Sequence, residues 1–229
     1  MFDAKSLLDQ VLGTAEKYAG KENIDKLREK AAANPTLTKV GAVGAAGVLL
    51  GTGFGRSLLK LGGAAAVAGL GYKTYQDWQA KQKGETPISR SEPVALPPQG
   101  SGFEHSGEDE QERALAFITA MIAAAKADGQ IDSFEQERIF GKLNELNTDA
   151  EAKAFLMNEM MAPLDLDKIV ALGKTKEQAV EIYAASAMAV LIDTPEERSY
   201  LNTLADRLGL DRELTAMIET AVNDERAAV

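Results

Sequence analysis

TKEQAVEIYAASAMAVLIDTPEERSYLNTLADRLGL, residues 175–210, decides the fold that this sequence predicts. Thr175 followed by Gln178 has the spacing of a capping box, which satisfies free backbone N–H groups at a helix start. An apolar run follows, and Thr194-Pro195 then opens a second helix, because proline is favoured in the first helical turn. Gly209 is the residue type that commonly closes a helix. The stretch therefore predicts two consecutive helices joined by a short turn.

The sequence on either side continues this helical pattern. Apolar side chains recur at spacings of three and four residues from Glu112 onward, which is the periodicity of a helix face. Ser133, Asp165 and Asp211 stand where further helices begin, and Pro163 follows the end of another. No strand pattern competes. The fold class predicted is all-α, with a C-terminal bundle of about seven helices.

An amphipathic helix is predicted over residues 3–31, ended by Asn34-Pro35. Two interpretations of it stay open: a short surface helix, or a helix that lies on a membrane or pairs with a partner. The apolar face consists of Leu7, Leu8, Val11, Leu12, Ala15 and Tyr18.

The stretch VGAVGAAGVLLGTGFGRSLLKLGGAAAVAGLGY, residues 40–72, is rich in glycine and alanine. Arg56 and Lys60 divide it into apolar blocks shorter than the roughly 20 residues that span a bilayer. The alternatives are a tight apolar helical hairpin, one tilted span, or a flexible linker, and we expect membrane association. A small-residue face repeats every fourth residue and predicts homo-oligomer contacts in lipid; it consists of Gly47, Gly51 and Gly55.

Charge and proline divide the chain into four predicted segments. Residues 1–102 carry 13 Lys+Arg and 9 Asp+Glu, whereas residues 103–229 carry 12 and 26. An acidic half of this kind repels nucleic acid, which we therefore exclude as a partner. The segments are an amphipathic helix (1–35), a membrane-associating segment (36–83), a Pro/Gly/Ser-rich linker (84–110) and an acidic helical domain (111–229).

Several classes of site are excluded by what the sequence lacks. There is no cysteine, so disulfides, thiolate metal sites and cysteine nucleophiles are excluded. The single histidine, His105, falls in the linker. A site made of several histidines within one chain is therefore excluded.

The segment ADGQIDSFE is compared with a calcium-binding EF-hand loop. With Gly129 at the sixth loop position, Asp128 falls at the fifth and Glu135 at the twelfth, where a calcium loop has ligands. The first and third positions are Ala124 and Lys126, which cannot ligate calcium. The segment is therefore a tight helix–turn–helix and not a working EF-hand.

A partial repeat of this turn follows at Ile192–Arg198, where Asp193 and Glu197 match the first pair of carboxylates. Two such units packed face to face would gather four carboxylates, a group that needs a cation or raised pKa values. An oxygen-only cluster suits Ca²⁺, Mg²⁺ or Mn²⁺. The alternative is that the two aspartates cap helices and the two glutamates favour helix N-termini through the dipole. In that interpretation Arg138 and Arg198 pair with these carboxylates. The candidate metal ligands are Asp128, Glu135, Asp193 and Glu197.

The DGxIDxxE turn, the run from Glu197 to Leu208 and the EIYAASAMAVLID helix resemble the TerB-like domain of tellurite-resistance proteins. The layout of the whole chain resembles YebE-type bacterial inner-membrane proteins of unknown function. The resemblance implies an acidic site able to bind a divalent cation, and a location at the bacterial inner membrane. Basic residues on both sides of the Gly/Ala-rich stretch favour a hairpin with both ends, and therefore the C-terminal domain, in the cytoplasm.

The function expected from these features is non-enzymatic. We expect a membrane-tethered sensor or scaffold whose acidic helical domain binds a partner protein, together with a divalent cation in the cation-site interpretation. One alternative is a structural, oligomerising membrane protein. The other is a metal-assisted hydrolase, although no nucleophile with an adjacent base is visible in the sequence.

Overall fold

The computed structural model describes residues 2–18, 61–85, 94–127, 149–190, 192 and 194–227. Within these ranges the chain forms eight helices and no strand, so the all-α fold class is confirmed. The helices are α1 (Ala4–Tyr18), α5 (Gly63–Gln82), α6 (Glu108–Ala125), α8 (Ala150–Met161), α9 (Leu166–Ala171), α10 (Lys176–Ala189), α11 (Pro195–Arg207) and α12 (Arg212–Ala227).

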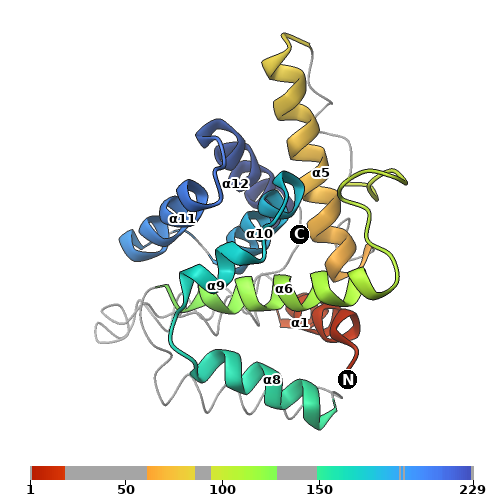
Figure 1. Ribbon diagram of the computed structural model, residues 1–229, viewed down its shortest axis with the longest axis vertical. Helices are drawn as coiled ribbons and strands as arrows, with labels where there is room; N and C mark the ends of the chain where they lie inside the picture. Colours follow the sequence, from red (N-terminus) through yellow and green to blue (C-terminus); the bar gives the residue numbers. More distant parts are fainter. Residues whose placement is uncertain are drawn as a thin grey trace.

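Helix α10 is the centre of the core (Figure 1). It packs against α5, α6, α11 and α12, and every residue from Ala179 to Val190 is buried. A helix that is covered on all sides has no need of a polar face, which explains the nearly continuous apolar run of its sequence. Helix α8 lies at the edge of the molecule, beneath α6 in the view of Figure 1.

The starts of the C-terminal helices are those that the sequence predicts. The Asp165 carboxylate accepts a hydrogen bond from the Lys168 N–H at 3.0 Å and begins α9. The Thr175 hydroxyl accepts from the Gln178 N–H at 3.2 Å and begins α10. In a full capping box the Gln178 side chain would also accept a hydrogen bond from the Thr175 N–H. Here it accepts one from the N–H of the preceding residue, Lys174.

The full capping box occurs one helix later, where the sequence predicts only a proline-led start. The Thr194 hydroxyl accepts from the Glu197 N–H, and the Glu197 carboxylate accepts from the Thr194 N–H, both at 3.2 Å. Gly209 follows α11 with a φ of 64°, the left-handed conformation that favours glycine.

Helix α1 packs against α5 and α6 of the same chain. Its side chains Leu7, Leu8 and Leu12 are buried in the common core. The Gln111 side chain of α6 accepts a hydrogen bond from the Ala4 N–H at 2.7 Å and donates one to Asp3 at 3.0 Å. The part of the apolar face formed by Leu7, Leu8 and Leu12 is therefore occupied by the protein's own helices. Residues 19–31 of the predicted helix lie outside the described residues.

Helix α5 contains most of the second apolar block of the Gly/Ala-rich stretch. Its first half is buried against α1, α10 and α12, with Val67 and Leu70 almost inaccessible to solvent. Full burial of a leucine side chain contributes roughly 1.5–3 kcal/mol, and here protein side chains supply the apolar surroundings. The Gly/Ala-rich composition, from which a membrane segment is predicted, here belongs to a helix of the protein core.

No helix in the parts of the chain that the structure describes is long and apolar enough to cross a bilayer. The predictions of a transmembrane helix and of a bacterial inner-membrane location are therefore wrong. The predicted apolar hairpin is not confirmed, and its first block, which contains Gly47, Gly51 and Gly55, lies outside the described residues.

Residues 94–107, which fall in the predicted linker, have no helix or strand. They nevertheless contribute buried side chains to the bundle. Val94 is 7% exposed and Phe103 is 3% exposed, and both belong to the same core cluster as α5 and α10. This segment therefore follows a fixed path over the helices.

Candidate functional site

Of the four predicted metal ligands, the structure describes Glu197 only. Asp128, Glu135 and Asp193 lie outside the described residues. Glu197 is buried, takes part in the capping box of α11, and interacts electrostatically with Arg226 of α12. Its capping role and its basic neighbour are features of the alternative interpretation in which these residues cap helices or pair with arginine.

Within the described ranges, no group of three or more acidic or histidine side chains is arranged to hold a metal ion. Since three of the four predicted ligands are outside those ranges, the carboxylate cluster and its Ca²⁺, Mg²⁺ or Mn²⁺ stay a prediction. The described residues instead form three other polar features.

The first feature is a buried charged cluster of His105, Glu181 and Arg113. Nε2 of His105 lies 2.9 Å from a carboxylate oxygen of Glu181, and the second oxygen lies 3.9 Å from a guanidinium nitrogen of Arg113. Glu181 is fully buried, and the other two side chains are less than a tenth exposed. The contact with His105 is short but poorly aligned for a hydrogen bond. Arg113 also donates to the Leu172 carbonyl at 3.0 Å.

Burial raises the pKa of the Glu181 carboxyl, and the neighbouring His105 and Arg113 oppose that rise. An ionised carboxylate in such a place requires partners of opposite charge, because transfer out of water is costly. The cluster therefore ties three segments together: residues 94–107, α6 and α10.

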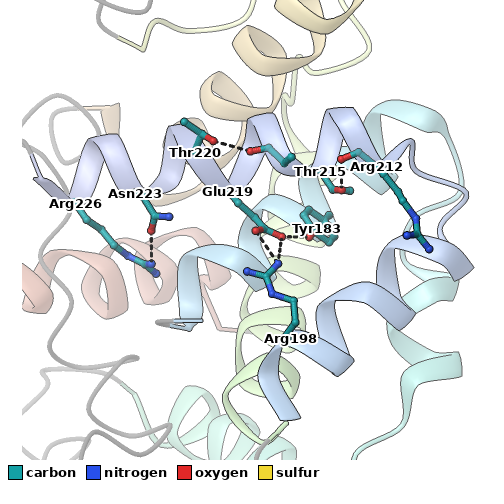
Figure 2. Close-up of polar contacts among 9 residues, drawn as sticks. Tyr183, Arg198, Arg212, Thr215, Glu219, Thr220, Asn223 and Arg226 are labelled. Atoms are coloured by element: carbon teal, nitrogen blue, oxygen red, sulfur yellow. Dashed lines mark hydrogen bonds and ion pairs between the residues drawn. The ribbon is translucent and has the colours of Figure 1, made fainter. Parts of the chain in front are cut away.

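The second feature is a network between α12 and the neighbouring helices α10 and α11, shown in Figure 2. The Glu219 carboxylate accepts a hydrogen bond from the Tyr183 hydroxyl at 2.6 Å and two from the Arg198 guanidinium at 2.8 and 2.9 Å. Arg226, further along α12, donates to the carbonyls of Ala187, Met188 and Val190 at the end of α10. Burial raises the pKa of Tyr183, and it lowers the pKa of Arg226 to about 10. These contacts join α10, α11 and α12, which is a structural role.

The third feature is a small hollow between α5 and α12, which we call the acidic groove. Leu70 and Val94 form its apolar floor with Met217 and Ala221 of α12. Three carboxylates and one ammonium group surround the floor, so the groove carries a negative excess. These charged residues are Asp77, Asp224, Glu225 and Lys73. Partial burial raises the pKa of Glu225. The positive charge of Lys73 lowers this pKa, and the negative charge of Asp224 raises it further.

The acidic groove has a volume of about 70 Å³. Sites for small molecules and cofactors are typically about 300–1,000 Å³. A second hollow, between α11 and α12 beside Arg198 and Arg212, measures about 140 Å³. The acidic groove therefore has room for the end of one side chain, and its charge selects a cationic one.

Sequence reasoning missed both the buried cluster and the acidic groove. Glu181 is the one carboxylate within the apolar run from Ala179 to Val190, which is a signal for a buried charge with a partner. The glycine, serine and glutamate residues around His105 predict a linker at that position. The acidic groove has no local signal, since α5 and α12 lie far apart in the sequence.

Comparisons with known proteins give a family and no activity. The family model described as "Protein of unknown function (DUF533)" matches residues 36–222. The chain is 23% identical over 118 residues to an uncharacterized protein in the ampR 5' region of Yersinia enterocolitica. That match covers 52% of this chain and 85% of the relative. No solved structure matches the chain.

Proposed function

The chain belongs to the DUF533 family, and we propose that it is a non-enzymatic, protein-binding helical scaffold whose acidic groove receives a basic side chain of a partner protein. The observation that carries this proposal is the groove itself. Three carboxylates and one ammonium group surround an apolar floor in a hollow large enough for one side-chain end.

A lysine or arginine fits this place in two ways. Its methylene stem is apolar and packs on a floor such as Leu70 and Met217, while its charged head stays near the carboxylates. Partial burial of Glu225 raises its pKa, so a cation beside it would favour the ionised form. Binding of a cation therefore relieves a cost that the unbound groove bears.

The charge of the chain supports the same kind of partner. Residues 103–229 hold 26 acidic and 12 basic residues, and such an excess attracts basic surfaces over distance. Attraction of this kind raises the rate of encounter, and a groove with a fixed shape supplies the specificity. The sensor or scaffold role expected from the sequence is retained in this form, without a membrane tether.

The finer family assignment is part of the proposal. We infer that the C-terminal helices form a TerB-like arrangement. The support is the sequence resemblance in the run from Glu197 to Leu208, where α11 opens with a capping box and closes at Gly209.

The test is a titration of the intact chain with the peptide acetyl-Leu-Lys-Leu-Lys-amide, followed by the NMR shifts of backbone amides. We expect the largest shifts in α5 and α12 around Thr74 and Ala221. The double variant Asp224→Asn/Glu225→Gln should weaken binding about tenfold, which corresponds to about 1.4 kcal/mol.

The matched control is Glu196→Gln/Asp206→Asn, which removes the same two charges from exposed positions of α11. It should leave the dissociation constant within about twofold of the wild-type value, because exposed charges at a distance are screened by salt. Equal weakening by both double variants, or shifts spread over the whole surface, would show only diffuse attraction and would reject the groove.

A further inference from the structure

Residues 94–107 lead from Val94, which lines the acidic groove, to the start of α6. We call them the strap. Their buried side chains are Val94 near the start, Phe103, and His105 near the end. Between these anchors the chain is largely exposed, as Leu96 is at 62%. A segment with few buried contacts and no helical hydrogen bonds opens locally more easily than the helices beneath it.

Three glycines allow the strap to lie against the helices. A Cβ atom on Gly69 of α5 would lie 2.6 Å from the Ala95 carbonyl oxygen and 2.8 Å from Val94. A Cβ on Gly71 would lie 3.3 Å from the ring of Phe103. A Cβ on Gly102 of the strap would lie 2.7 Å from Glu177 of α10. The strap is therefore seated by close approaches along its length.

One polar contact secures the strap near its C-terminal end. His105 reaches Glu181 of α10 at 2.9 Å, beneath the surface of the bundle. The ring of His105 also packs on Phe117 of α6, with centroids 5.9 Å apart. Glu181 has no exposed surface, so water cannot stabilise its negative charge. The histidine supplies part of that stabilisation. The contact therefore acts as a latch between the strap and α10.

The start of the strap is also part of the groove. Val94 lines the acidic groove together with Leu70 of α5, and it packs on Gly69 at the same time. Movement of the strap away from α5 would remove Val94 from the apolar floor of the groove. The groove has its described shape only while the strap is seated.

We propose that the strap is a regulatory element, latched by His105 on Glu181, that holds the acidic groove in its binding shape. This inference rests on the proposed function of the groove. Release of the latch lowers the affinity for a basic side chain, and occupation of the groove holds the strap closed, because coupling between two sites is reciprocal.

The chain carries its own reporter for the strap. Its single tryptophan, Trp78, stacks on Tyr75 with centroids 5.7 Å apart, and Tyr75 packs on Phe103 at 5.7 Å. Displacement of Phe103 changes the surroundings of this aromatic pair. Tryptophan emission and hydrogen exchange of the strap amides therefore measure the same opening independently.

The experiment compares the intact wild-type chain with His105→Gln and His105→Ala, using hydrogen exchange, tryptophan emission and titration with acetyl-Leu-Lys-Leu-Lys-amide. Both variants should speed hydrogen exchange of the strap amides. They should also weaken peptide binding by about fivefold or more, which is the lower end of typical allosteric effects on affinity. The peptide should slow exchange of the wild-type strap. The matched control is Leu96→Ala, an exposed position of the same strap, which should behave as the wild type.

The outcomes separate the two proposals. Unchanged strap exchange and emission in both histidine variants overturn the latch, whatever the peptide does. Faster exchange with an unchanged peptide affinity overturns the regulation. If the peptide does not bind the wild-type chain at all, the proposed function of the groove fails and the regulation falls with it, whereas the exchange data still decide whether the latch exists. Loss of helical circular dichroism in His105→Ala would leave His105→Gln as the deciding variant.

Discussion

Helices α5 and α10 both belong to the common core, and their sequences differ. Helix α10 contains both large and small side chains and is buried from Ala179 onward. Helix α5 begins with glycine and alanine, is buried in its first half, and ends with exposed charged residues such as Lys81. Glycine in α5 allows α1, α10 and the strap to approach closely, whereas α10 fills the space between its neighbours with side chains. A Gly/Ala-rich apolar stretch is therefore as typical of a tightly packed core helix as of a membrane segment.

The largest effect should come from truncating a buried side chain in each of these two helices. Leu70→Ala in α5 and Ile182→Ala in α10 both open a cavity in one core cluster. We expect each to lower the free energy of unfolding by about 2–5 kcal/mol, measured by urea denaturation followed by circular dichroism. If Ile182→Ala lowers the free energy of unfolding strongly and Leu70→Ala does not lower it, the two helices do not contribute equally to the core. Leu96→Ala, at an exposed position, is the control.

A smaller effect is expected where the glycines of α5 meet the strap. Gly69→Ala places a Cβ atom 2.6 Å from the backbone oxygen of Ala95, which cannot move without displacing the strap. Overpacking of this kind costs typically about 1–3 kcal/mol. Gly71→Ala meets side chains at 3.3 Å or more, and the gain in helix propensity of about 0.8–1 kcal/mol offsets the crowding. Gly69→Ala should therefore lower the thermal midpoint clearly more than Gly71→Ala, and the reverse order would contradict the path of the strap.

The capping box of α11 should contribute less again. Thr194→Ala removes the hydroxyl that accepts from the Glu197 N–H, and loss of such a cap costs about 1 kcal/mol. Thr194→Ser keeps the oxygen and should recover most of that loss in the same urea experiment. If serine is no better than alanine, the hydroxyl is not the stabilising group.

The smallest expected effect is a dependence on pH that distinguishes α10 from α5. Burial raises the pKa of Glu181 above its ordinary 4.5, so its contribution to stability is full below that pH and falls as pH rises through the raised value. The charged groups that face Glu181 are His105, Arg113 and Asp109. The comparison is therefore made in the His105→Gln background, where no imidazole titrates.

In that background, Glu181→Gln should become progressively more stable relative to its parent as the pH rises above about 4.5. The measurement is the urea midpoint of the two proteins over a series of pH values. A difference that stays constant with pH would show that the carboxyl titrates with the same pKa in the folded and unfolded states.

Much of the fold could be predicted from local signals. Thr175, Thr194-Pro195 and Gly209 mark helix ends through interactions within a few residues, and the structure has helix ends at these positions. The role of α5 could not be read in this way. Periodicity reports that its residues avoid water, and it does not report whether lipid or protein replaces the water.

The candidate site was less predictable than the fold. His105 and Glu181 meet through the path of an irregular segment, which leaves no periodic signal in the sequence. The acidic groove requires α5 and α12 to lie side by side, although they lie far apart in the chain. The carboxylates singled out from their spacing include one that the structure describes, Glu197. Its capping bond to Thr194 is a local interaction that the sequence analysis does not predict.

The central claim is that α5 belongs to the same cooperative core as the C-terminal helices, where it builds the acidic groove with α12. Native-state hydrogen exchange of the intact chain tests this most directly, because amides that open only on global unfolding share one free energy. We predict that the amides of residues 66–71 in α5 and 182–189 in α10 exchange with the same free energy of opening and the same dependence on urea. Rapid exchange of the α5 amides while those of α10 remain protected would contradict the account.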